Sequence, residues 1–200
     1  MLIDTEHLHY WMQAIRQSDD PMRTMDAFWS GQLKSKEWLI ETLSMHCAIK
    51  SGPYDVDIYG GWVGVLASMI FQSTIPVWKI RSIDIDASCE SIATMMNKGE
   101  EIQGRFTAIT ADMCDIPSEA NIVINTSCEH ITQAQYHQWL NLIPKDSLLV
   151  LQSNNYAIPE HVRIANSLDE FKQQSGVDVI WAGELKLPLY TRYMIVGQRG

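Results

Sequence analysis

The sequence predicts an α/β fold in which a mostly parallel sheet is covered by helices on both faces. Strand-like and helix-like segments alternate from about residue 54 onward, which is the pattern of such folds. The first strand-like segment runs into Gly60, Gly61 and Gly64 and then directly into an apolar helix. Later strands end abruptly in Asp, Asn, Glu or His, at the edge where open α/β sheets bind ligands.

Length and composition are those of one domain, with room for a small helical appendage. The chain has 200 residues, 46% of them hydrophobic, and no apolar run approaches the roughly 18 residues of a membrane span. Its first residues lack the basic start and the apolar stretch of a secretory signal. We therefore expect a cytoplasmic protein that does not use a membrane.

Charge and cysteine placement argue against two further classes of protein. The net charge is -9 and the Lys and Arg residues are dispersed, which disfavours a nucleic-acid partner. The four cysteines are scattered, without a Cys-x-x-Cys pair or a short Cys/His spacing. The sequence therefore predicts reduced thiols, no disulfide and no metal site.

Residues 1–50 are predicted to form a helical cap on a domain that occupies residues 51–200. Apolar residues recur at helical spacing in three stretches, separated by a Ser-Asp-Asp-Pro break and by Gly31. Ser35 is expected to cap the third helix. Exposed tryptophans in the cap are candidates for the interface of a homo-oligomer.

The remaining elements follow a turn at residues 51–53. Two capping boxes predict helix starts at Thr132 and Ser167, and Pro144 and Gly176 are expected to end these helices. The last two strands fit an antiparallel pair at the edge of the sheet. The predicted strands are 54–59, 77–85, 106–110, 121–125, 147–152, 177–187 and 190–197, and the other predicted helices are 64–73 and 87–98, the latter ending at Gly99.

Carboxylates follow the second and third strands. Asp84 ends the second strand, about 20 residues beyond the glycine turn, where a carboxylate can accept hydrogen bonds from both hydroxyls of a ribose. Ile85 beside it can pack against a purine face. After the third strand, Asp112 and Asp115 compete to accept a hydrogen bond from an adenine amino group, and Asp112 is favoured because it is nearer to the strand.

The fourth and fifth strands both end in polar residues, and neighbouring parallel strands would bring these ends together. The residues are Asn125, Ser127, Glu129 and His130 after the fourth strand, and Asn154, Asn155 and Tyr156 after the fifth. Either end alone has the composition of an ordinary loop. Together they predict a site, because buried strands seldom end in so many hydrogen-bonding groups unless a ligand occupies the crevice.

This order of features resembles the class I S-adenosylmethionine-dependent methyltransferases, across about residues 50–200. The shared features are an acidic, glycine-rich first loop, acids after strands two and three, the pair Glu129–His130 and the closing strand pair. The resemblance implies a Rossmann-like, seven-stranded sheet with its last strand antiparallel. It also implies S-adenosylmethionine as the cofactor and an N-terminal helical lid over the site.

The resemblance further implies roles for individual residues. Cofactor contacts are implied for Asp57, Tyr59, Gly60, Gly61, Trp62, Gly64, Asp84, Ile85, Asp112 and Met113. Catalysis is implied near Asn125, and Glu129 or His130 is a candidate to orient or deprotonate the acceptor. The acceptor pocket is expected to be lined by Ser127, Asn154, Asn155 and Tyr156.

Two departures from the family pattern bear on these roles. The glycines are spaced differently, Trp62 takes the place of a small residue, and Asp57 is one position off as the acidic anchor of the loop. The fourth strand lacks the Asn/Asp-Pro-Pro-aromatic signature of enzymes that methylate base amino groups. The expected acceptor is therefore an N or O atom of a small molecule or peptide, and not a nucleic acid.

Two other functions fit a similar sheet. A noncatalytic S-adenosylmethionine-binding sensor or partner subunit would account for the unusual first loop. A nicotinamide-dependent oxidoreductase would need Gly-x-Gly-x-x-Gly and usually Tyr-x-x-x-Lys, and neither is present. Lys36 and Trp38 are weaker candidates for pocket contacts, and Lys36 is a candidate partner for the cofactor carboxylate.

Overall fold

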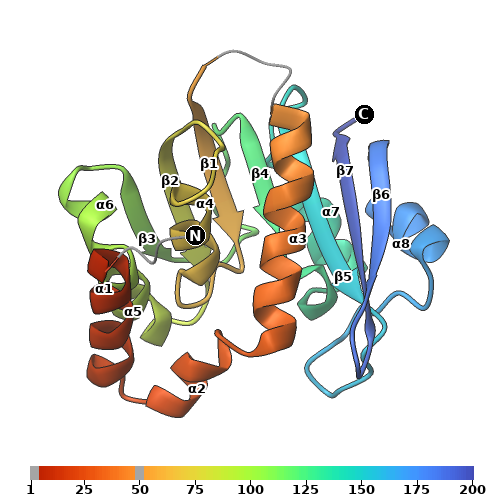
Figure 1. The fold of residues 1–200 in the computed structure, drawn as a ribbon. Helices are drawn as coiled ribbons and strands as arrows, with labels where there is room; N and C mark the ends of the chain where they lie inside the picture. Colours follow the sequence, from red (N-terminus) through yellow and green to blue (C-terminus); the bar gives the residue numbers. More distant parts are fainter. Residues whose placement is uncertain (1–4, 48–51) are drawn as a thin grey trace.

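The computed structural model describes residues 5–47 and 52–200 as a seven-stranded sheet with helices packed on both faces (Figure 1). Residues 1–4 and 48–51 lie outside this description, and with them both ends of the predicted cap and the first residue of the predicted turn. The strands are β1 (Tyr54–Tyr59), β2 (Val77–Asp84), β3 (Phe106–Thr110), β4 (Ile122–Asn125), β5 (Leu148–Asn154), β6 (Asp178–Lys186) and β7 (Thr191–Gln198).

The strand order is β3-β2-β1-β4-β5-β7-β6, and β1 to β5 are parallel. The last strand, β7, is antiparallel to both of its neighbours and lies between β5 and β6. The prediction of a mostly parallel, Rossmann-like sheet whose last strand is antiparallel is confirmed. The closing pair also forms as expected, with β6 at the edge of the sheet and β7 inside it.

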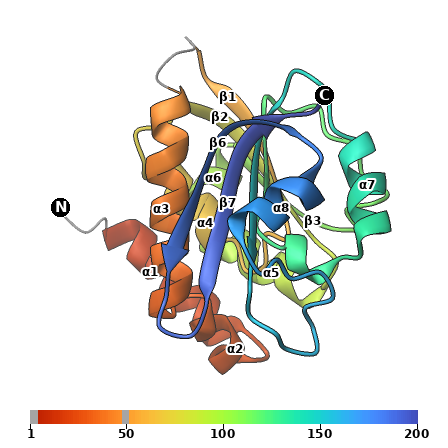
Figure 2. The ribbon, with the colours of Figure 1, turned by 90° about the vertical axis from the view of Figure 1, so that its right-hand side faces the viewer.

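Helices cover the two faces of the sheet. They are α1 (Thr5–Gln17), α2 (Pro21–Asp26), α3 (Ser30–Cys47), α4 (Val65–Phe71), α5 (Ser88–Met96), α6 (Lys98–Ile102), the short 3-10 turn η1 (Cys128–His130), α7 (Gln133–Asn141) and α8 (Leu168–Ser175). The helices α3 and α4 pack on one face, and α7 and α8 pack on the other. Figure 2 shows α3 and α7 on opposite sides of the sheet.

Alternate side chains of β7 enter the two cores. Met194 and Val196 pack on the side of α3, whereas Tyr193 and Ile195 pack on the side of α7. Because both faces are covered, β4 and the first half of β5 are continuous apolar runs without hydrophobic alternation, whereas β1 and β2 also carry charged residues. The same pattern in the sequence therefore marks a buried strand.

The third helix begins earlier than predicted. α3 starts at Ser30, so Gly31 lies in its first turn and does not end the preceding helix. Ser35 is an interior residue of α3 and not its cap, and its buried hydroxyl donates a hydrogen bond to Gln152 Oε1 over 3.0 Å. The helix is held against the sheet by this contact and by the buried side chain of Leu39.

The sequence predicts one helix over residues 87–98, but the structure has two helices after β2. Asn97 separates α5 from α6, and its side-chain amide donates a hydrogen bond to the Gly64 carbonyl over 3.0 Å. Gly99 therefore lies within α6 and does not end the helix. The two predicted N-caps do form, since Thr132 and Ser167 accept hydrogen bonds from backbone N–H groups of the first turns of α7 and α8.

The state of the cysteines, the absence of a membrane-spanning helix among the described residues and the packing of α3 bear on three further predictions. The four cysteines are buried free thiols, and burial raises the pKa of Cys128 to about 12. Within the described ranges, no helix combines the length and the apolar character needed to cross a bilayer. The division of the chain at residue 50 stays a prediction, since Leu39 and Leu43 of α3 belong to the same core as β1.

Candidate functional site

One large cavity, of about 1070 Å³, opens where β1 to β5 reach their carboxyl ends. Its walls come from the loops after these strands, from α2 and the first turns of α3, and from the turn between β6 and β7. The register explains this convergence, because Tyr59 pairs with Asn125 of β4 and Asp84 pairs with Thr110 of β3. Typical small-ligand pockets measure roughly 300–1,000 Å³, so this cavity lies at the upper end of that range.

The turn after β1 has a backbone conformation that residues other than glycine rarely adopt. Gly60 and Trp62 have φ angles of 68° and 49°, in the left-handed region. A Cβ atom on Gly60 would lie 2.3 Å from Ser127 Oγ, and one on Gly61 would lie 2.0 Å from Ser82 Oγ. Because Gly60 and Gly61 have no side chain, the turn can pack directly against Ser127 and Ser82 of the neighbouring strand ends.

Asp84 fixes this turn and faces the cavity. Its Oδ2 accepts a hydrogen bond from the Trp62 backbone N–H over 2.8 Å, and its Oδ1 accepts one from the Asp86 N–H over 3.0 Å. An ionised carboxylate has about four acceptor sites, so Asp84 keeps capacity for further donors. Ile85 beside it lines the cavity with a side chain that is 72% exposed, which is an open apolar surface next to the carboxylate.

Of the two acids that follow β3, Asp112 lines the cavity and Asp115 does not. Asp112 Oδ1 accepts a hydrogen bond from the Cys114 backbone N–H over 2.8 Å, which orients the carboxylate. Met113 lines the cavity beside it, whereas the side chain of Asp115 is exposed to solvent. The geometry therefore favours Asp112 over Asp115 as a ligand-binding acid.

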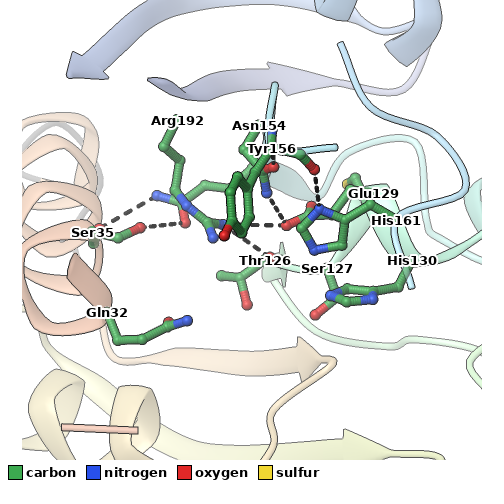
Figure 3. A network of polar contacts seen from close by, with 12 residues as sticks. Gln32, Ser35, Thr126, Ser127, Glu129, His130, Asn154, Tyr156, His161 and Arg192 are labelled. Atoms are coloured by element: carbon green, nitrogen blue, oxygen red, sulfur yellow. Dashed lines mark hydrogen bonds and ion pairs between the residues drawn. The ribbon is translucent and has the colours of Figure 1, made fainter. Parts of the chain in front are cut away.

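A buried polar network joins the ends of β4, β5 and β7 (Figure 3). Glu129 Oε1 accepts a hydrogen bond from the Asn154 side-chain amide and lies 3.7 Å from Arg192 Nη1. The Arg192 guanidinium also donates to the Thr126 carbonyl over 3.3 Å. These residues line the cavity, so an ion pair that is largely shielded from water forms part of its wall.

Two histidines lie beside this network. The rings of His130 and His161 meet edge to face, with centroids 4.7 Å apart. His130 Nδ1 lies 3.2 Å from the Glu160 carbonyl oxygen, and His161 Nδ1 lies 2.6 Å from the Tyr156 carbonyl oxygen. His130 is exposed and His161 is half-buried, and both line the cavity.

The helix α3 contributes a lysine with an unusual acidity. Lys36 Nζ donates a hydrogen bond to Gln32 Oε1 over 3.0 Å. Burial in the cavity wall, together with the nearby positive charge of Arg192, lowers the pKa of Lys36 from 10.5 to about 7. Near neutral pH this side chain is therefore partly uncharged, and an anion bound next to it would favour its protonation.

Most of the residues predicted from the sequence line this one cavity. They are Lys36, Gly60, Gly61, Trp62, Asp84, Ile85, Asp112, Met113, Ser127, Glu129, His130, Asn154 and Tyr156. The structure thus brings the acids after β2 and β3, the glycine turn, and the polar ends of β4 and β5 to the same place.

Asp57 and Tyr59 lie outside the lining of the cavity. The Asp57 carboxylate is buried and pairs with Arg81 Nη2 at 2.5 Å, and it accepts a hydrogen bond from Ser118 Oγ over 2.6 Å. The Tyr59 hydroxyl donates to the Ile116 carbonyl over 3.1 Å. Both side chains therefore stabilise the sheet and do not face the cavity.

Gly64 and Trp38 also lie outside the lining, for packing reasons. Gly64 has a φ angle of 78° and precedes α4, and a Cβ atom there would lie 3.0 Å from the Ala93 Cβ of α5. The Trp38 ring packs edge to face on Trp181 of β6, with centroids 6.0 Å apart. Gly64 thus allows two helices to approach, and Trp38 packs against the sheet.

The side chains of Asn125 and Asn155 are used by nearby backbone groups. Asn125 is buried and accepts a hydrogen bond from the Ser127 N–H over 2.9 Å. Asn155 accepts one from the Thr191 N–H over 2.8 Å. Neither residue lines the cavity, so each shapes a loop that does.

Some residues of the cavity are absent from the sequence-based predictions. Arg192 could have been identified from the sequence, because a lone arginine in the otherwise apolar strand β7 needs a buried partner. His161 lies in the long loop after β5, where no feature of the sequence indicates a site residue. The lining from α2, including Arg23 and Asp26, also has no signal in the sequence beyond an amphipathic pattern.

No protein-family model matches the sequence, and no curated protein matches it. Solved structures do match the fold. Magnesium protoporphyrin IX methyltransferase (ChlM) from Synechocystis PCC 6803, with bound SAH, superposes with a TM-score of 0.65 at 13% identity, over 98% of this chain and 95% of that chain. The mitomycin 7-O-methyltransferase MmcR superposes with a TM-score of 0.63 at 15% identity, over 94% of this chain and 60% of that chain.

A third structure is geranyl diphosphate methyltransferase in complex with GPP and sinefungin. It superposes with a TM-score of 0.63 at 13% identity, over 84% of this chain and 79% of that chain. The chain has the class I methyltransferase fold. The superposition on ChlM covers 98% of the chain and so extends over its N-terminal helices. Fold alone does not fix function, which depends on the chemistry of the site.

Proposed function

We propose that the protein is an S-adenosylmethionine-dependent methyltransferase that acts on an N or O atom of a small molecule or peptide. The observation that carries this proposal is that the glycine turn, Asp84 and Asp112 line a single cavity. These are the groups that an adenosine ligand needs for its ribose and its adenine. The similar structures with bound SAH or sinefungin support the same choice of cofactor.

The residues of the cavity fit each part of this cofactor. Asp84 retains acceptor capacity for the ribose hydroxyls after binding two backbone N–H groups. Ile85 and Met113 offer apolar contact to a purine, and Asp112 is placed to accept a hydrogen bond from its amino group. The close-packed turn at Gly60, with Gly61 and Trp62, would hold the methionine part.

The acceptor is proposed to lie between the glycine turn and the network around Glu129. S-Adenosylmethionine supplies an activated methyl group when it is bound. The task left to the chain is to hold the acceptor atom in line, to exclude water and to accept a proton. Glu129 and His130 are the candidate proton acceptors, and Ser127 and Tyr156 would contact the acceptor.

The N-terminal helices are proposed to act as the lid. Residues of α2 and of the first turns of α3 line the cavity, among them Trp29, whose side chain is 69% exposed. Lys36 faces the same space and is a candidate partner for the carboxylate of the cofactor or for an anionic acceptor. Assembly of two copies through this cap stays a prediction.

A noncatalytic sensor of the same cofactor is the second candidate. The observation that favours it is the bulky Trp62, with its positive φ angle, in a turn where a small residue is usual. A sensor would need the cofactor contacts at Asp84 and Asp112 but no proton acceptor. The two functions therefore differ in what Glu129 and His130 are expected to do.

Calorimetric titration with S-adenosylmethionine, its demethylated product and NAD tests the proposal. We expect the first two to bind and NAD not to bind. Asp84→Asn should weaken cofactor binding about 10- to 100-fold, because charge-assisted hydrogen bonds contribute roughly 1.5–3 kcal/mol each. Asp115→Asn is the matched control, since its exposed carboxylate lies outside the cavity, and it should bind like the unaltered chain.

Turnover with a panel of N and O acceptors then separates enzyme from sensor. Glu129→Gln and His130→Ala should lower turnover while cofactor affinity is retained. Unchanged turnover in both variants would remove these residues from the mechanism. Tight cofactor binding without turnover on any acceptor would support the sensor, and binding of NAD in place of S-adenosylmethionine would contradict both.

A further inference from the structure

We propose that Glu129, His130 and His161 form a binding site for one divalent transition-metal ion in the wall of the cavity. One ligand atom from each of these side chains lies within 4.8 Å of the other two. Figure 3 shows the three side chains next to one another, from η1 and from the loop after β5. Two imidazoles and one carboxylate are a recurring ligand set for Zn²⁺ and Fe²⁺ sites that keep an open position.

Backbone contacts orient both imidazoles for this role. His130 Nδ1 lies 3.2 Å from the Glu160 carbonyl oxygen, and His161 Nδ1 lies 2.6 Å from the Tyr156 carbonyl oxygen. A neutral ring whose Nδ1 hydrogen is donated to a carbonyl presents an unprotonated Nε2, which is the form that binds a metal. Metal-binding histidines commonly have such a second contact, which fixes the tautomer and the direction of the ring.

Glu129 provides the negative charge, and one of its oxygen atoms lacks a partner. Its side chain is 2% exposed, and Oε1 contacts Asn154 and Arg192. Oε2 is buried and has no hydrogen-bond partner among the residues that the structure describes. Leaving a buried acceptor without a partner is unfavourable, and more so for a charged group. A cation held beside the two histidines would supply the missing partner.

The separations fit a site that contracts on binding. Ligand atoms at about 2.0–2.2 Å from a tetrahedral Zn²⁺ lie roughly 3.3–3.6 Å from one another. Ligand atoms that are now within 4.8 Å would therefore need to approach by about 1 Å. The exposed His130 and the half-buried His161 have room to move, whereas Glu129 is held in the network.

The ion would face the space proposed for the acceptor, because all three residues line the cavity. Three protein ligands leave a position open for an oxygen or nitrogen atom of a bound molecule. A hydroxyl bound to a metal has a lowered pKa and releases its proton to water more readily. With the ion bound, Glu129 and His130 would therefore act on the acceptor through the ion and would not take the proton themselves. This role rests on the proposed function, whereas binding of the ion does not. A metal site at these residues differs from the prediction of none, which rested on the spacing of Cys and His residues along the chain.

The test uses the full chain without a polyhistidine tag, freed of metal by dialysis against a chelator. Calorimetric titration with ZnCl₂, in the absence of cofactor, should give one Zn²⁺ ion per chain. Loss of a group that only contacts a metal ligand lowers metal affinity roughly 10- to 100-fold. His161→Ala and His130→Ala each remove a ligand itself, so each should weaken Zn²⁺ binding by at least that factor. With Co²⁺ in place of Zn²⁺, the visible absorption of the bound ion should change in both variants.

His137→Ala is the matched control, because it removes an exposed histidine of α7 that lies outside the cavity. It should bind Zn²⁺ like the unaltered chain. Thermal unfolding and cofactor titration of each variant show that the fold is retained. The proposal is overturned if the unaltered chain binds no Zn²⁺, or if both histidine variants bind it as tightly as the unaltered chain. Either result would leave cofactor binding, and so the proposed function, untouched.

Discussion

Lys36 is the residue whose charge the fold changes most clearly. Its ammonium group is desolvated in the cavity wall and lies near Arg192, so its pKa falls from 10.5 to about 7. The unfolded chain keeps the higher value, and between the two values the unfolded state binds more protons than the folded state. The free energy of unfolding therefore rises with pH through this window. Below about pH 7 both states are protonated, and the cost of burying the charge is present in full.

Replacing Lys36 by Met should therefore stabilise the protein in a pH-dependent way. We expect the gain in the free energy of unfolding to be largest near pH 6 and to shrink toward pH 10, as the folded-state amine becomes neutral. Urea unfolding at several pH values measures it. Lys145→Met changes an exposed lysine and should show no such trend. Equal gains from Lys36→Met at both ends of the range would contradict the lowered pKa.

Among individual residues, the sequence predicts best those that directly follow a buried strand. Asp84 and Asp112 line the cavity because parallel strands end at one edge of the sheet, and the chain direction determines which edge. Asp57 lies within a strand, where successive side chains point to opposite faces, and its carboxylate turns to Arg81. His161 lies in a loop whose path depends on distant contacts, so only the structure places it in the cavity.

Two ion pairs join β1 to β2, and they differ in burial. Asp57 is 2% exposed and pairs with Arg81 at 2.5 Å. Asp55 and Lys79 lie 3.4 Å apart with side chains that are 33% and 51% exposed. Exposed pairs contribute about 0–1 kcal/mol, whereas removing one partner of a buried pair costs about 3–5 kcal/mol. The two neighbouring acids of one strand should therefore differ in their effect on stability.

Asp57→Asn is expected to lower the free energy of unfolding by about 2–3 kcal/mol, less than for a fully buried pair because solvent screens the partly exposed Arg81. Asp55→Asn should cost less than about 1 kcal/mol. Urea denaturation of the two variants gives both values under the same conditions. A similar loss in both would show that burial does not set the strength of these pairs.

Element boundaries could be predicted where the signal is local. The caps at Thr132 and Ser167 form because each side chain needs only backbone groups within its own first turn. The start of α3 could not be predicted in this way, since Ser35 reads as a cap but instead bonds Gln152 of β5, far along the chain. The break at Asn97 likewise depends on the Gly64 carbonyl of another helix terminus.

At the scale of the molecule, the cavity connects parts of the chain that are distant in sequence. The N-terminal helices, the loops at the strand ends and the turn between β6 and β7 all line it. The alternation of strands and helices predicted the sheet, because the apolar residues of each segment and the turn residues between segments are local signals. The side-chain contacts that close the cavity are long-range, so they could not be predicted.

A ligand that fills this cavity should stabilise the whole fold. S-Adenosylmethionine at about 100 times its Kd should add roughly 2.7 kcal/mol to the free energy of unfolding, which raises Tm by about 5–10 °C for a chain of this size. Differential scanning fluorimetry measures this shift. Asp84→Asn should show a smaller shift at the same concentration, and NAD should give none. A shift with NAD alone would contradict the choice of cofactor.

The position of β7 has a consequence for biosynthesis. The ribosome makes β6 before β7, but β6 reaches the sheet only through β7, which lies between it and β5. Until β7 emerges, β5 presents an open edge that can pair with other nascent chains. The nascent polypeptide is therefore most vulnerable to aggregation between the synthesis of β5 and the emergence of β7, which is when a chaperone on the ribosome would protect it.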